Sequence, residues 1–168
     1  MKKIILMLAL TLGVATMASA QKYAVVNSEK VFKSIEAYNS ALTQLESLAE
    51  QYQKQVDAKF EAVETLYNTY MERKSSLSAA SQQANEENIL KKEQEATEFQ
   101  ESLFGSEGEL MKKRLELIQP IQKKVFDAIE KYAKEQGYDM IIDVAQNATM
   151  LYYSTTADKT EQIIQMVK

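Results

Sequence analysis

The chain reads YNSALTQLESLAEQYQKQVDAKFEAVETLYNTY over residues 38–70, and this stretch decides the fold. Its apolar residues recur at steps of three and four, which places them on one face of an α-helix, close to the heptad seam of a coiled coil. Because the stretch has no glycine or proline, it predicts one uninterrupted arm. The predicted seam consists of Tyr38, Leu42, Leu45, Ala49, Tyr52, Val56, Phe60, Val63, Tyr67 and Tyr70.

A second helical pattern follows a stretch in which small polar residues replace charges, between about residues 75 and 85. This stretch predicts the tip of an antiparallel helical hairpin that spans residues 41–132, with the second arm beginning near Glu86. Gly105, Gly108 and Pro120 interrupt the second arm. They are either imperfections that a long helix tolerates or hinges of a flexible arm.

The two ends of the chain predict a small β-rich body made from residues 21–40 and 133–168. Tyr23–Val26 is a short apolar strand pattern. Residues 138–144 and 149–153 are expected to form a β-hairpin with a turn at Gln146–Asn147. A terminal helix is expected at residues 157–168. The fold class is therefore α+β. A sheet this small leaves apolar surface exposed in a monomer, which predicts self-association. The expected oligomerisation core is Ala24, Val25, Val26, Met140, Ile141, Ile142 and Val144.

Residues 1–20 have the features of a cleaved secretory signal peptide. Lys2 and Lys3 precede an apolar core, and Ala18-Ser-Ala20 is a small-residue cleavage site. The alternative is an uncleaved anchor, but no stop-transfer charges follow. We expect the chain to reach the periplasm or beyond. Removing the two signal lysines from the formal net charge of −4 leaves −6.

The composition argues against an enzyme. The chain has no cysteine and no histidine, so the commonest metal ligand and the usual general base at neutral pH are both missing. It also has no glycine-rich phosphate loop, no nucleophile motif and no zinc-binding spacing. The sequence therefore predicts no catalytic residue, no metal and no cofactor.

Charge and apolar residues beside the seam suggest two kinds of contact. Residues 86–109 carry eight acidic residues against two lysines, whereas residues 110–132 carry six basic residues against three acidic ones. A solvated helix face explains such charges, but the basic belt also predicts steering of anionic groups. Its members are Lys112, Lys113, Arg114, Lys123 and Lys124. Leu48, Leu66 and Met71 lie beside the strict seam and are candidates for weak contacts with a bound chain.

Both ends of the chain resemble the Skp, or OmpH-like, family of periplasmic chaperones. The resemblance rests on YAVVNSEKVF at residues 23–32, on GYDMIIDV at 137–144, on LYY at 151–153 and on DKTE at 158–161. LIQPIQKKV at 117–125 is also similar to OmpH-like chains. The layout matches over the whole mature chain, although any long helical hairpin would match the middle.

The resemblance implies a homotrimer whose helical arms hold unfolded outer-membrane proteins without ATP. The best-known members are basic, whereas this mature chain is acidic. Its charge therefore argues against contact with a membrane, anionic lipid or lipopolysaccharide. Acidity and compartment both argue against nucleic acid. The alternative is a non-catalytic envelope structural or adaptor protein with one defined partner.

Overall fold

The structure is a computed structural model that describes residues 21–146 and 149–168. The described chain divides into two compact units. The body unit consists of the described residues up to Ser34 together with Lys124–Lys168, and the arm unit consists of Ile35–Lys123. Helix α5 contributes residues to both units.

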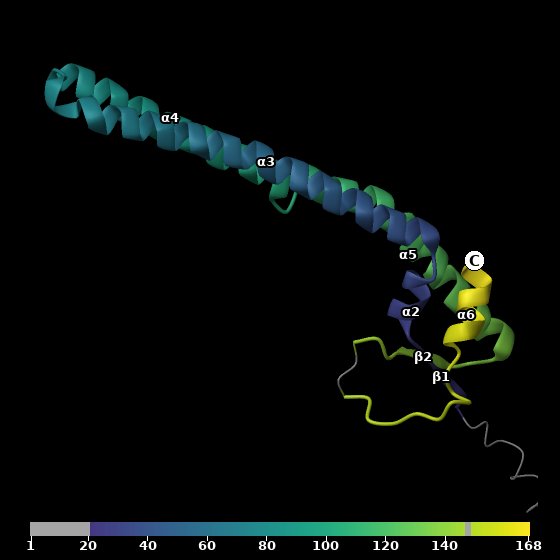
Figure 1. Ribbon diagram of the computed structural model, residues 1–168. Coiled ribbons are helices and arrows are strands. Elements are labelled where there is room, and N and C mark those ends of the chain that lie inside the picture. Colours follow the sequence, from purple (N-terminus) through teal and green to yellow (C-terminus); the bar gives the residue numbers. More distant parts are fainter. Residues whose placement is uncertain (1–20, 147–148) are drawn as a thin grey trace, which may run out of the picture. The chain divides into compact units, whose positions relative to one another are not determined.

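The arm unit confirms the predicted helical hairpin. Helix α3 (Glu36–Arg73) has 38 residues, and α4 (Ala79–Phe104) returns beside it (Figure 1). The short 3-10 turn η1 (Lys74–Ser76) connects them. Helix α4 begins earlier than the expected start near Glu86. The reason is local: the Ser78 hydroxyl accepts a hydrogen bond from the Ser81 backbone N–H, and alanine favours helix directly after this cap.

The second arm is two helices, because the chain leaves the helix between Gly105 and Gly108. Helix α5 (Glu109–Gln136) then continues through Pro120 without interruption. Proline removes the N–H that would bond the Glu116 carbonyl, but both residues are exposed, so water can satisfy that carbonyl.

The body unit contains a two-stranded parallel sheet. Strand β1 (Tyr23–Val26) pairs with β2 (Met140–Asp143), in a register that sets Val25 opposite Ile142. The other edge of β1 is also occupied: the Val25 N–H donates to the Ala157 carbonyl, and the Lys159 N–H donates to the Val25 carbonyl. Strand β1 is therefore central.

The expected β-hairpin at the C-terminal end is wrong in its second strand. Residues 149–153 form no strand, and Asn147 of the expected turn lies outside the described residues. Residues 149–153 do not pair with β2, although no described strand occupies the second edge of β2. Leucine and tyrosine favour strands only where their side chains also pack against a buried face. Leu151 and Tyr152 instead remain 94% and 83% exposed.

Helices α2 (Ser28–Lys33) and α6 (Thr160–Val167) pack together and complete the body. The core holds a set of buried aliphatic side chains, of which Ile163 is the largest that is fully buried. Its members are Ala24, Val25, Val26, Val31, Val125, Ile163, Ile164 and Val167. Burial of this set supplies the main stabilisation of the body.

The end of α5 is fixed to β1. Gly137 adopts a φ of 66°, a left-handed conformation that favours glycine, and the Tyr138 N–H closes the helix on the Ala133 carbonyl. The Lys22 ammonium donates to the Gln136 carbonyl at 2.6 Å and lies 4.5 Å from the centre of the Tyr138 ring. The N-terminal segment thus caps a helix that ends more than a hundred residues later in the chain.

A carboxylate at the end of β2 caps the start of α2. Asp143 accepts hydrogen bonds from the backbone N–H of Ser28 at 3.1 Å and from its hydroxyl at 2.5 Å, and a third from the Ala145 N–H. Burial raises the pKa of Asp143, but the bonds from Ser28 and Ala145 outweigh it and hold that pKa below the ordinary 3.8.

We expect Asp143→Asn to lower the free energy of unfolding by about 1 kcal/mol at neutral pH. A depressed folded pKa contributes stability that is present above the ordinary value and lost as pH falls through the folded value. The difference between wild type and variant should therefore shrink between pH 4 and pH 2. Urea titrations at several pH values measure it, and a difference that grows on acidification contradicts the assignment.

Candidate binding surface of the helical hairpin

The seam between α3 and α4 is narrower than the sequence pattern suggests. On α3 the buried apolar side chains along the arm include Val56 and Tyr70, and on α4 they are Ile89, Ala96 and Leu103. Two contacts that involve aromatic rings also join the helices. The ring centres of Tyr52 and Phe104 lie 6.2 Å apart in an edge-to-face arrangement. The Lys59 ammonium lies 4.6 Å from the centre of the Phe99 ring. The hairpin is therefore held by one thin row of contacts.

A polar cluster closes the tip of the hairpin. The Tyr70 hydroxyl donates to the Glu86 carboxylate at 2.5 Å, and the Lys74 ammonium donates to the same oxygen at 3.1 Å. These two hydrogen bonds, the one from Tyr70 first, hold the pKa of Glu86 below its ordinary value. The Gln82 amide caps the turn by donating to the carbonyls of Lys74 and Leu77.

Tyr70→Phe should loosen the tip without unfolding the arm, because it removes one donor and leaves the ring in the seam. We expect faster amide hydrogen exchange over residues 74–86 and unchanged exchange in α6. Exchange monitored by mass spectrometry tests this, with Tyr67→Phe as the control, since no hydrogen bond joins the Tyr67 hydroxyl to another residue in the described part of the chain. Equal exchange rates over residues 74–86 in both variants would contradict a role of the Tyr70–Glu86 hydrogen bond in closing the tip.

An apolar stripe remains uncovered on α3. Leu42, Phe60, Tyr67 and Met71 are 44%, 36%, 47% and 48% exposed. Successive residues of an α-helix are rotated by about 100°, so all four side chains point within about 20° of one direction. That direction lies about 80° around the helix axis from the seam. We call these four residues the α3 stripe. Three of them, all except Met71, were expected in the seam, and the structure corrects that expectation.

The spacing along α3 shows that the predicted row of apolar residues covers two faces of the helix. A heptad pattern drifts by about 20° per seven residues on a straight helix, so a long row of three- and four-residue steps mixes two faces. Leu42 and Phe60 are 18 residues apart, which is five helical turns and returns to the same direction. The position of α4 against α3 decides which of the two faces is covered.

From the sequence, Leu48, Leu66 and Met71 are candidates for contact with a bound chain. Leu48 and Leu66 lie on the side of the seam that faces away from the α3 stripe. Leu48 and Leu66 are half-buried. Leu66 lines a groove of about 460 Å³ between α3 and α4, together with Lys59, Val63, Asn88 and Lys92. Of the three candidates named from the sequence, Met71 lies in the α3 stripe.

The basic belt on α5 is largely engaged within the chain. Lys112 pairs with Glu109 at 2.8 Å and Lys113 pairs with Glu116 at 2.9 Å. The Lys124 ammonium donates to the Val167 carbonyl and so caps the end of α6. Arg114 and Lys123 are exposed. Local pairing reduces the positive field that this belt presents to a distant anion.

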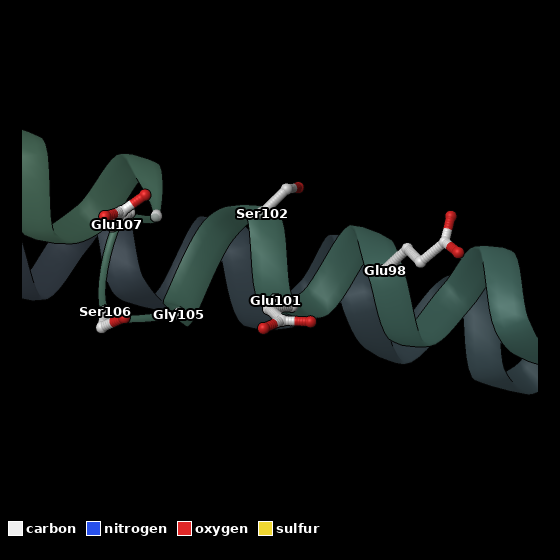
Figure 2. Close-up of a pocket in the computed structure, with 7 residues that line it drawn as sticks. Glu98, Glu101, Ser102, Gly105, Ser106 and Glu107 are labelled. Atoms are coloured by element: carbon white, nitrogen blue, oxygen red, sulfur yellow. The ribbon is translucent and has the colours of Figure 1, made fainter.

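The predicted hinge positions differ in structure. Figure 2 shows the chain leaving α4 at Gly105 and passing through Ser106 and Glu107, with Glu98 and Glu101 on the adjoining turns. A Cβ on Gly105 would lie 2.5 Å from the Glu101 carbonyl oxygen, closer than any side chain tolerates. Gly105 and Gly108 therefore permit a tight excursion from the helix, whereas Pro120 lies inside α5.

Apolar side chains are also exposed on the body unit. Met140 of β2 is 59% exposed and Tyr23 of β1 is 63% exposed, whereas Ile141, Ile142 and Val144 are half-buried. By contrast, the other expected members of the oligomerisation core, Ala24, Val25 and Val26, are covered by the chain's own residues. The apolar surface that a partner could still cover lies on β2 and near Leu151.

The described residues contain no group of three or more acidic residues placed to hold a metal ion. Among the helices of the described ranges, none is long and apolar enough to cross a membrane.

A helical hairpin with an uncovered apolar stripe, together with a small body whose described residues form two strands and short helices, places the chain among α+β proteins that have a helical-hairpin arm. Comparison with known proteins specifies the family. The model of the outer membrane protein (OmpH-like) family matches residues 22–167, and the chain belongs to that family. The chain is also similar to the chaperone protein Skp of Yersinia enterocolitica, at 26% identity over 170 residues that cover all of both chains.

Proposed function

We propose that this protein is an exported, ATP-independent holdase that binds unfolded outer-membrane proteins and prevents their aggregation. The observation that carries the proposal is the α3 stripe, which leaves four large apolar side chains partly exposed along one direction. Such a surface offers many weak contacts and no fixed pocket, which suits a protein that accepts many unfolded sequences. Membership of the OmpH-like family and the similarity to a chaperone support it.

The proposed binding cycle needs no chemical step. An unfolded client would lay its apolar segments against the stripes of several arms, so that weak contacts add through multivalency. Release follows when folding into the membrane is more favourable than these contacts. No catalytic residue or cofactor enters this cycle.

We further propose that the assembled protein is a homotrimer. Strand β2 has an edge that pairs with no other described strand, and Met140 and Leu151 lie exposed near this end of the chain. A second copy could pair with that edge and cover these side chains. The number of three subunits comes from the family resemblance. We also propose that residues 1–20 are an export signal and that the protein acts in the periplasm.

The test dilutes a urea-denatured outer-membrane β-barrel protein into buffer that contains the exported protein, and follows aggregation by light scattering. We expect stoichiometric protein to keep the barrel soluble in the absence of ATP. A second, unrelated barrel protein must be protected as well, because a dedicated adaptor would ignore it. Unchanged scattering with both proteins would contradict the holdase function.

A further inference from the structure

The acidic residues of α3 are all concentrated beside the α3 stripe. Between Leu42 and Arg73 the helix has six acidic residues, namely Glu46, Glu50, Asp57, Glu61, Glu64 and Glu72. At about 100° per residue, all six point between about 40° and 120° from the direction of Leu42. Only Lys54 among the three basic residues of that span shares the sector. The stripe thus has an acidic border along one side and the seam along the other.

The border is not neutralised within the chain. All six carboxylates are exposed, and none forms an ion pair with another described residue. Asp57 accepts a hydrogen bond from the neutral Gln53 amide. On α4 and α5, by contrast, Glu95, Glu109 and Glu116 pair with lysines three residues away. The apolar stripe and the free carboxylates therefore form one amphipathic face.

We propose that this face selects client segments in which lysine or arginine adjoins aromatic or aliphatic side chains. This selectivity is a property of the proposed holdase function and rests on it. An extended segment of about 13 residues matches the span from Leu42 to Met71, about 43 Å. Its apolar side chains would lie on the stripe, while long basic side chains reach across to the carboxylates. This charge complementarity makes the occupant a cationic, apolar segment of an unfolded chain.

The expected preference is moderate and sensitive to salt. Each ion pair at an exposed surface contributes little, so several must act together to give about a tenfold difference in affinity. Ions at 0.5 M screen such pairs almost completely, whereas they leave the apolar contacts intact. We therefore expect the preference for basic segments to disappear at high salt while binding itself persists.

The experiment compares two synthetic peptides that share the same leucines and phenylalanines and differ only in having lysine or glutamate at the intervening positions. Fluorescence anisotropy measures their binding to the exported protein. The test variant carries Glu46→Gln, Asp57→Asn and Glu64→Gln on α3. The matched control carries Glu87→Gln, Glu93→Gln and Glu98→Gln on α4, which changes the net charge equally, at exposed positions that form no ion pair with another described residue. Circular dichroism verifies that both variants keep their helices.

We expect wild type and the α4 variant to bind the lysine peptide about tenfold more tightly, and the α3 variant to bind both peptides alike. Equal affinity of wild type for both peptides overturns the proposal, as does an equal loss in both variants, which would reflect net charge alone. If barrels remain protected from aggregation in either case, the holdase function stands and only the selectivity fails. If barrels are not protected, both proposals fail.

Discussion

Replacing the α3 stripe by glutamine at all four positions should weaken client binding by about 100-fold. Each side chain is roughly half exposed, so covering the remainder contributes somewhat under 1 kcal/mol, or about 3 kcal/mol for the four. Since 1.4 kcal/mol corresponds to a factor of ten, the loss is about two orders of magnitude. In the scattering assay, stoichiometric variant protein should no longer keep a barrel soluble.

The single variants Tyr67→Gln and Leu90→Gln provide a matched comparison for this prediction. Leu90 lies on α4 outside the stripe and is 65% exposed. Tyr67→Gln should weaken binding several-fold, whereas Leu90→Gln should leave it nearly unchanged. Because all these positions are exposed, the helical content and the urea midpoint should stay the same. Equal losses from the two single variants would mean that any exposed apolar side chain serves, and that the stripe has no particular role.

Ile163→Ala should have the largest effect on stability, lowering the free energy of unfolding by about 2–5 kcal/mol. Ile163 is fully buried on α6, in the core beneath β1, and its truncation leaves a cavity among aliphatic side chains. That loss is a large fraction of the total stability of an ordinary domain, about 5–15 kcal/mol. Urea unfolding followed by circular dichroism measures it.

The control for this prediction is Gln165→Ala, two residues away on the exposed face of the same helix. It should change stability by less than about 0.5 kcal/mol. Protein concentration must be the same in every titration, because the proposed self-association would raise the apparent stability. If Ile163→Ala unfolds at the wild-type midpoint, the core of the body is not where the structure places it.

The hairpin could be predicted from sequence because its determinants are local. The three- and four-residue spacing of residues 38–70 and the lack of glycine or proline there allow only a long helix.

What the sequence did not reveal depends on contacts between distant residues. The tip cluster is one example, because Tyr70 and Lys74 meet Glu86 across the turn. Residues 149–153 have strand propensity, but they pair with neither β1 nor β2, and Leu151 and Tyr152 stay exposed. Strand identity depends on such pairing more than on residue type.

The candidate surface was only partly predictable for the same reason. Met71 was recognised beside the seam, yet Leu42, Phe60 and Tyr67 fit the heptad steps and were assigned to it. Only the position of α4 decides which apolar residues of α3 are covered. Likewise, the role of Lys124 in capping α6 follows from a contact 43 residues away in sequence.

The most direct test of the account places a photo-crosslinking residue at Tyr67 in the α3 stripe and, in a second sample, at Leu90 on α4. Each protein, comprising residues 21–168, is mixed with a urea-denatured barrel protein diluted into buffer, irradiated, and analysed for covalent complexes. The account predicts strong crosslinking of the barrel from position 67, little from position 90, and none from either once the barrel has folded into lipid. Equal crosslinking from both positions, or none from position 67, would contradict the central claim that the α3 stripe holds the unfolded client.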